Sequence, residues 1–192
     1  MTSSVWVQLL FVTLLLAGGS GCGHDKRNER AARFQVADEN KWVFEVVQKA
    51  DQLILYEGLP HPTWEPELLA EERRTKETVT LHEFSFYASP IAIPATNKEK
   101  LKSILADEQW YCPWQGEGMC GGFHPDYLAE WHVGDAAYQF LVCFGCLDVW
   151  VYGPDKDLRY GMSGKAAKTI EELLKKHRKH RPPKSTIATT VN

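Results

Sequence analysis

The chain has 192 residues, of which 44% are hydrophobic and 11% aromatic, enough for one domain with a substantial core but not for two. Its formal net charge of −3 is unevenly distributed, because one short segment is strongly basic. That segment contains no acidic residue and consists of Lys175, Lys176, Arg178, Lys179, Arg181 and Lys184. The remaining 16 basic and 25 acidic residues give the rest of the chain a charge of about −9. An acidic body argues against sequence-specific nucleic-acid binding, which needs its basic stripe on the folded face.

The N-terminal region has the layout of an export signal. Its first charged side chain is that of Asp25. Residues 5–17 are almost entirely apolar, but this segment is shorter than the roughly 20 residues that span a bilayer. Small residues follow at 18–22, as in a secretory signal. The alternative is a buried N-terminal helix, which an apolar run ending in GGSG disfavours.

The segment AGGSGC (17–22) resembles the lipobox of bacterial lipoprotein precursors. Ser20 and Gly21 match the small positions, and Gly19 stands where that family prefers leucine. The resemblance implies that Cys22 carries a diacylglyceryl group and an N-acyl chain such as palmitate. It also implies a protein anchored on the extracytoplasmic side of a bacterial membrane. The alternative is an ordinary signal peptide, cleaved near Gly21, that leaves Cys22 as a thiol.

These features predict four regions. Residues 1–21 form a signal peptide, and residues 22–36 form the lipidated cysteine with a flexible tether. Residues 37–180 form the folded domain, and residues 181–192 form a disordered tail.

In the first half of the domain, apolar spacing predicts helices and short extended segments. Helices are expected at 37–50, from Thr63 or Glu65 onward, and at 97–110 with Asn97 as the cap. Residues 52–60 are expected to form a strand. Residues 78–87 also alternate, but their phase slips, which predicts one strand with a bulge at 82–83.

The second half predicts an antiparallel meander followed by a helix. Apolar residues alternate along 127–133, 138–142 and 149–151, with short connections between these segments. Residues 164–177 have helical spacing. The predicted fold is therefore a single α+β domain, with an antiparallel sheet of three to five strands packed with helices.

Four cysteines fall within 35 residues, and the last two form the segment CFGC (143–146). This segment predicts a hairpin with a two-residue loop, in which Gly145 has positive φ. The strand-like sequence after Cys146 argues against a thioredoxin-type site, which lies at a helix N-terminus. Leu147 stands where a c-type haem site would need histidine.

Two chemistries remain open for these cysteines. The first is a zinc site formed by Cys112, Cys120, Cys143 and Cys146, with His124 able to replace one of them. The second is a structural role, either as a pair of disulfides, Cys112–Cys120 and Cys143–Cys146, or as free thiols. Disulfides are the default in exported proteins.

The segment CGGFHPDY (120–127) suggests a third alternative, a hydrolase or redox enzyme. Cys120, His124 and Asp126 would form its site. The structural alternative is a proline-stiffened loop in which Asp126 accepts hydrogen bonds from local amides. Together with CFGC, this segment resembles parts of uncharacterised exported bacterial proteins. That resemblance implies one structural unit and no activity.

The sequence favours a non-enzymatic binding or structural module of the cell envelope. Its expected partners are the membrane, through the lipid anchor, and an envelope protein or cell-wall polymer. Trp150, expected on the exposed face of its strand beside Tyr152, suggests a binding surface.

Overall fold

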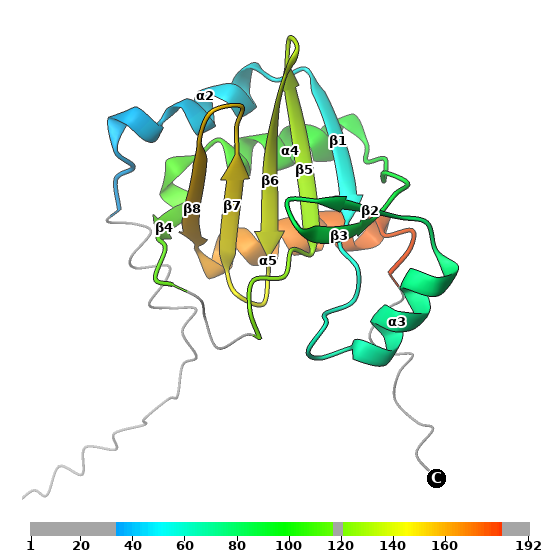
Figure 1. Ribbon diagram of the computed structural model, residues 1–192. Coiled ribbons are helices and arrows are strands. Elements are labelled where there is room, and N and C mark those ends of the chain that lie inside the picture. Colours follow the sequence, from blue (N-terminus) through cyan, green and yellow to red (C-terminus); the bar gives the residue numbers. More distant parts are fainter. Residues whose placement is uncertain (1–33, 117–120, 182–192) are drawn as a thin grey trace, which may run out of the picture.

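The computed structural model of the chain describes residues 34–116 and 121–181, and Figure 1 shows an antiparallel sheet backed by helices. This arrangement confirms the predicted single α+β domain, although the main sheet has six strands rather than three to five. In spatial order the strands are β1 (Gln52–Glu57), β5 (Tyr127–Val133), β6 (Ala136–Cys143), β7 (Asp148–Tyr152), β8 (Asp157–Met162) and β4 (Tyr111–Pro113). The sequence did not predict β4 and β8, which lie together at one edge.

One face of the sheet packs against three helices. They are α2 (Trp42–Lys49), α4 (Ala95–Leu105) and α5 (Gly164–Leu174), and Figure 1 shows α4 and α5 behind the strands. Their apolar sides meet the main core, in which Trp131 and Phe140 are fully buried. Helix α5 begins after Ser163, whose Oγ accepts a 3.1 Å hydrogen bond from the Ala166 amide. Three short 3-10 helices complete this layer: η1 (Asp38–Asn40), η2 (Glu108–Trp110) and η3 (Lys175–His177).

The opposite face is covered in part by the hairpin of β2 (Thr78–Leu81) and β3 (Phe84–Tyr87). Phe86 of this hairpin joins Leu128 and Leu141 in a second apolar cluster. Helix α3 (Pro66–Thr75) connects β1 to the hairpin, with proline in its first turn as expected.

The bulge predicted in 78–87 is wrong, because this segment folds back on itself. His82 and Glu83 have φ of 49° and 71°, and they form the two-residue connection between paired strands. Two successive positive φ values characterise the tight hairpin turns whose twist matches that of the strands. The phase slip in the alternation of 78–87 therefore marks the point where the chain reverses direction.

Asn97 is not the cap of α4, because the helix begins two residues earlier, after Pro94. Asn97 instead lies in the first turn and is buried. Its Nδ2 atom is 2.7 Å from Nε2 of His177, so it connects α4 to η3. The helix also ends at Leu105, short of the predicted position 110.

The folded domain extends beyond 37–180 at both ends. Val36, expected in the tether, is 3% exposed, and Arg181, expected in the tail, is 8% exposed. The predicted signal peptide, Cys22 and positions 182–192 lie outside the described residues. Within 34–116 and 121–181, no helix is both long and apolar enough to cross a membrane.

Candidate functional site

A group of buried and half-buried polar residues lies at one end of the sheet, where β1 and β6 end and β5 begins. Glu57 pairs with Tyr127 across β1 and β5, and Tyr127 pairs with Val142 across β5 and β6. The amide of Gly58 donates a 2.8 Å hydrogen bond to the Asp126 carbonyl. A Cβ atom at Gly58 would lie 2.0 Å from the Pro125 carbonyl oxygen, so only glycine permits this approach.

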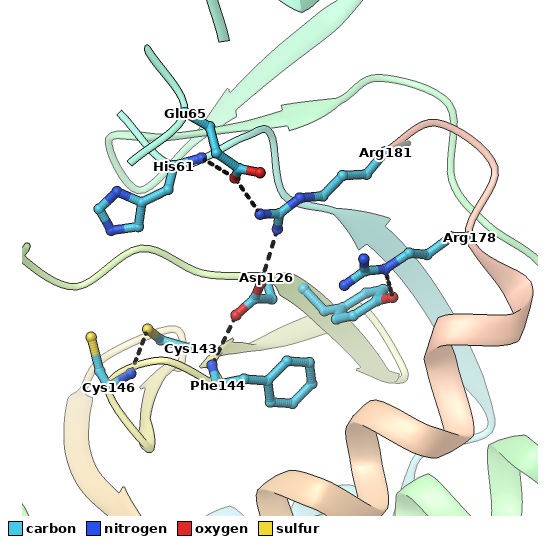
Figure 2. Close-up of polar contacts among 9 residues, drawn as sticks. His61, Glu65, Asp126, Cys143, Phe144, Cys146, Arg178 and Arg181 are labelled. Carbon is cyan, nitrogen blue, oxygen red and sulfur yellow. Dashed lines mark hydrogen bonds and ion pairs between the residues drawn. The ribbon is translucent and has the colours of Figure 1, made fainter. Parts of the chain in front are cut away.

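Arg181 bridges two carboxylates at this end of the sheet (Figure 2). Its Nη2 atom lies 2.7 Å from Glu65 Oε2, and its Nη1 atom lies 2.9 Å from Asp126 Oδ1. The arginine side chain is 6% exposed, and the two carboxylates are 15% and 16% exposed. We call Glu65, Asp126 and Arg181 the bridging cluster.

Backbone amides complete the bridging cluster. Glu65 Oε2 also accepts a 3.1 Å hydrogen bond from the His61 amide, and Asp126 Oδ2 accepts one of 2.8 Å from the Phe144 amide. Asp126 therefore connects residues 178–181, which we call the C-terminal segment, to the turn between β6 and β7. The amide that Asp126 accepts from is 18 positions away, rather than in its own loop as expected.

A second acid, Glu57, holds the segment that carries Arg181. Glu57 is 1% exposed, and its Oε2 atom accepts hydrogen bonds from the amides of Lys179 (2.9 Å) and His180 (3.0 Å). Arg178 Nε donates a 3.0 Å hydrogen bond to the Tyr127 hydroxyl. Residues 178–181 are thus fastened to the ends of β1 and β5.

Cys143 is a buried thiol held by two backbone amides. Its Sγ atom accepts hydrogen bonds from the amides of His124 and Cys146, the latter at 3.2 Å. Burial raises the pKa of Cys143 to about 11, although both amides act to lower it. Because the thiolate is the nucleophile and the metal ligand, this environment makes Cys143 unreactive near neutral pH.

The two-residue hairpin predicted for CFGC is wrong. Residues 144–147 all belong to the turn, and Cys143 pairs with Asp148 across it. The positive φ, 55°, falls on Leu147 rather than on Gly145. The longer turn lets the Cys146 amide point back at the Cys143 sulfur.

The predicted disulfide pairs Cys112–Cys120 and Cys143–Cys146 are absent, because Cys112 and Cys143 are both buried thiols. The four-cysteine zinc site also disagrees with the register of the sheet. Cys112 pairs with Gly161, Gly161 with Asp148, and Asp148 with Cys143. Three strand spacings, about 14 Å, therefore separate Cys112 from Cys143, whereas a shared zinc needs each sulfur about 2.3 Å from the metal.

Among the residues that the structure describes, no group of three His, Cys, Asp or Glu side chains could hold a metal ion. Cys120, the remaining candidate ligand, lies outside those residues. Cys146 lies beside the preceding loop, with its Sγ atom 3.3 Å from the Gly122 carbonyl oxygen.

His124 is close to Asp126 in sequence but is not hydrogen-bonded to it. Burial lowers the pKa of His124 to about 4. The negative charge of Asp126 acts to raise this pKa, whereas the nearby His61 and Arg181 lower it further. The rings of His61 and His124 lie 4.7 Å apart. The predicted Cys–His–Asp arrangement therefore lacks its His–Asp contact, since Asp126 bonds to Arg181 and Phe144 instead.

Trp150 is not the exposed binding residue expected from the sequence. It is 9% exposed and stacks on Phe123 with the ring centroids 4.0 Å apart. The Arg159 guanidinium lies 4.0 Å from its ring. Tyr152 is also occupied, because it stacks on His82 at 3.6 Å. The exposed large apolar side chain among the described residues is instead Trp64, at 65%.

The sequence indicated Asp126 and His124 but not their basic partners. Arg178 and Arg181 belong to the basic segment at 175–184, and residues from 181 onward were expected to form a disordered tail. Glu57 could have been identified from the sequence, because it is an acid at the end of an apolar strand. A carboxylate in such a position is buried and needs hydrogen-bond donors.

Comparisons with models of protein families, with curated proteins and with solved structures gave no match for this chain. Its function is therefore inferred from the residues at this end of the sheet.

Proposed function

We propose that this protein is a membrane-anchored extracytoplasmic lipoprotein whose domain is a non-enzymatic binding or structural module of the cell envelope. The anchor is supported by the lipobox-like segment ending at Cys22 and by the polar sequence that follows it. The membrane is one partner, and an envelope protein or cell-wall polymer is the other.

The observation that carries the non-enzymatic role is how the ionisable groups of the site are used. Arg181 is held between Glu65 and Asp126, and each carboxylate also accepts a backbone hydrogen bond. The pKa of Cys143 is raised to about 11 by burial. A nucleophile needs a lowered pKa or an adjacent base, and these groups have neither. Their arrangement suits a rigid scaffold.

Within this proposal, the remaining cysteines stabilise a loop. Cys112 and Cys143 are thiols, and Cys22 is assigned to the lipid, which leaves Cys120 and Cys146. Cys146 Sγ lies 3.3 Å from the carbonyl oxygen of Gly122, two residues after Cys120. Two residues of chain span at most about 7 Å. We therefore propose that the cysteines stabilise this loop through one disulfide, between Cys120 and Cys146.

The anchor is tested by expressing the full-length chain and its Cys22→Ala variant in bacteria. We expect palmitate labelling and membrane association in the parent and the loss of both in the variant. Cys112→Ala is the matched control and should keep both. Equal labelling of the Cys22→Ala variant would refute the lipoprotein assignment.

The state of the cysteines is tested by thiol counting and metal analysis on the same full-length protein. We expect two thiols that react only after unfolding, and two more that appear only after reduction. Peptide mapping should join Cys120 to Cys146. One zinc per chain with fully reduced cysteines would instead support the zinc alternative, and enzymatic turnover would contradict the scaffold role.

A further inference from the structure

A cavity of about 570 Å³ lies between α5, the C-terminal segment and the turn between β6 and β7. This volume is within the range of small-molecule sites. Its lining combines apolar and charged residues of both signs: Asp126, Phe144, Gly145, Glu171, Lys175, Arg178 and Arg181.

Two cations in this cavity differ from Arg181 in how they are used. Arg178 is half-buried and uses Nε to bond the Tyr127 hydroxyl. Its two Nη groups have no hydrogen-bond partner among residues 34–116 and 121–181. In Figure 2 its guanidinium points from the C-terminal segment toward Asp126. Lys175 lines the same cavity and is likewise without a side-chain partner in the described part of the chain.

The acids of the cavity leave these two cations available. Both oxygens of Asp126 are already engaged, one by Arg181 and the other by the Phe144 amide. Glu171 lies at the exposed side of α5. It would oppose a ligand with two negative charges more strongly than a ligand with one.

We propose that this cavity binds a small organic acid, with its carboxylate on Arg178 and Lys175 and its apolar body against Phe144. The planar guanidinium presents paired N–H donors that match the geometry of a carboxylate. The apolar ring beside it favours a ligand with a carbon skeleton over an inorganic anion. This assignment rests on the proposed binding role and names the class of ligand for it.

The test uses 4-fluorobenzoate as the probe, observed by fluorine NMR with the full-length protein in detergent. 4-Fluorobenzamide has the same ring without the charge and serves as the neutral control. We expect saturable broadening of the benzoate signal at millimolar concentrations and little change for the amide. Inorganic phosphate should displace the benzoate less effectively than acetate does.

Two neighbouring lysines provide matched variants. Lys175 lines the cavity, whereas Lys176 is exposed and does not line it. Lys175→Gln should weaken benzoate binding about threefold, and Lys176→Gln should leave it unchanged. Arg178→Gln should weaken binding about tenfold, as expected for loss of a charge-assisted hydrogen bond. Because the Lys175 side chain has no hydrogen bond or ion pair to lose within the described residues, its variant remains informative if Arg178→Gln disturbs the fold.

Several outcomes would overturn the proposal. They are equal binding of the amide, equal effects of the two lysine variants, stronger displacement by phosphate, and absence of benzoate binding. Each would remove the carboxylate assignment alone, because the anchoring and thiol experiments do not involve this cavity.

Discussion

At the scale of single residues, Arg181 is the side chain on which the site most depends. Replacing it with methionine keeps most of the apolar stem but leaves Glu65 and Asp126 without their shared cation. Breaking a largely buried ion pair typically costs several kcal/mol, because the remaining charge is left uncompensated. We predict that Arg181→Met lowers the free energy of unfolding by about 3 kcal/mol, measured by urea titration with tryptophan fluorescence.

The control for Arg181 is another arginine paired with an acid. Arg74 bonds Glu71 one helical turn away at 2.9 Å, but the two side chains are 71% and 53% exposed. Exposed pairs of this kind contribute about 0–1 kcal/mol. Arg74→Met should therefore change the free energy of unfolding by less than about 1 kcal/mol. Equal losses for the two variants would show that the bridging cluster has no special role.

The buried histidine makes a prediction about pH. His124 has its pKa lowered to about 4 in the folded protein, against 6.5 for an unperturbed histidine. The folded state therefore resists a proton that the unfolded state accepts. Its contribution to stability is complete above pH 6.5 and is lost as the pH falls toward 4. The full loss amounts to about 3 kcal/mol.

This pH dependence is measured by urea unfolding at several pH values between 7 and 4. The His124→Asn variant should lose less stability across this interval than the parent does. His180→Asn, which replaces a histidine bonded to the Ser89 carbonyl, should retain the parental decline. A decline that is the same with and without His124 would contradict the assignment.

At the scale of elements, the glycine that follows β1, Gly58, allows this strand to lie close to the start of β5. An added Cβ at Gly58 would meet the Pro125 carbonyl oxygen at 2.0 Å, so alanine must push β1 away from the start of β5. We predict that Gly58→Ala costs about 2–3 kcal/mol of stability, the size of other overpacking effects. Urea unfolding measures the loss.

Gly134 provides the contrast, since it has a φ of 58° but no described atom within 4 Å of the position that a Cβ would occupy. Gly134→Ala should cost only the strain of the left-handed conformation, about 1 kcal/mol. A larger loss at Gly134 than at Gly58 would show that backbone conformation, rather than the close contact, dominates at these positions.

Patterns within single elements were enough to predict most of the fold. Alternation identified β5, β6 and β7, and helical spacing identified α2 and α5, because one side of each packs on the core. The same patterns missed β4 and β8. Strand β4 has only three residues, too few to show a period. Strand β8 does alternate, because Leu158, Tyr160 and Met162 face the main core, but it was not identified from the sequence.

The turns and the site were harder to predict, for a physical reason. Whether a phase slip at His82 is a bulge or a reversal depends on which strand lies alongside, and that is a tertiary contact. The bridging cluster joins Glu65 to Arg181 across 116 positions. Sequence spacing carries no information about such a pair. Asp126 was identified only from its place beside His124 in the segment CGGFHPDY, whereas its partner, the Phe144 amide, lies 18 positions further along the chain.

At the scale of the whole molecule, the C-terminal segment closes the domain. After α5 the chain crosses the end of the sheet, and Figure 1 shows its orange-red segment on the side of β1 and α3. The basic residues that give the chain its charge asymmetry are therefore divided. Arg178 and Arg181 neutralise or bond groups at the sheet end, whereas Lys175 and Lys176 remain exposed.

This division predicts the outcome of two truncations. Stopping the chain after Leu174 removes the amides of Lys179 and His180, and so leaves Glu57 buried at 1% exposure without these donors. It also removes Arg181 from its two carboxylates. We predict a loss of about 4 kcal/mol or more, a large share of the roughly 5–15 kcal/mol that stabilises a typical domain.

Stopping after Arg181 instead retains all of these contacts, and the free energy of unfolding should change by less than about 0.5 kcal/mol. Urea unfolding of both truncated chains measures the difference. Glu57→Gln provides a milder third variant, because the amide oxygen can still accept from Lys179 and His180 while the buried charge is removed. If the chain ending at Leu174 were as stable as the chain ending at Arg181, the C-terminal segment would make no contribution to the stability of the domain. The end of the sheet would then hold together without it.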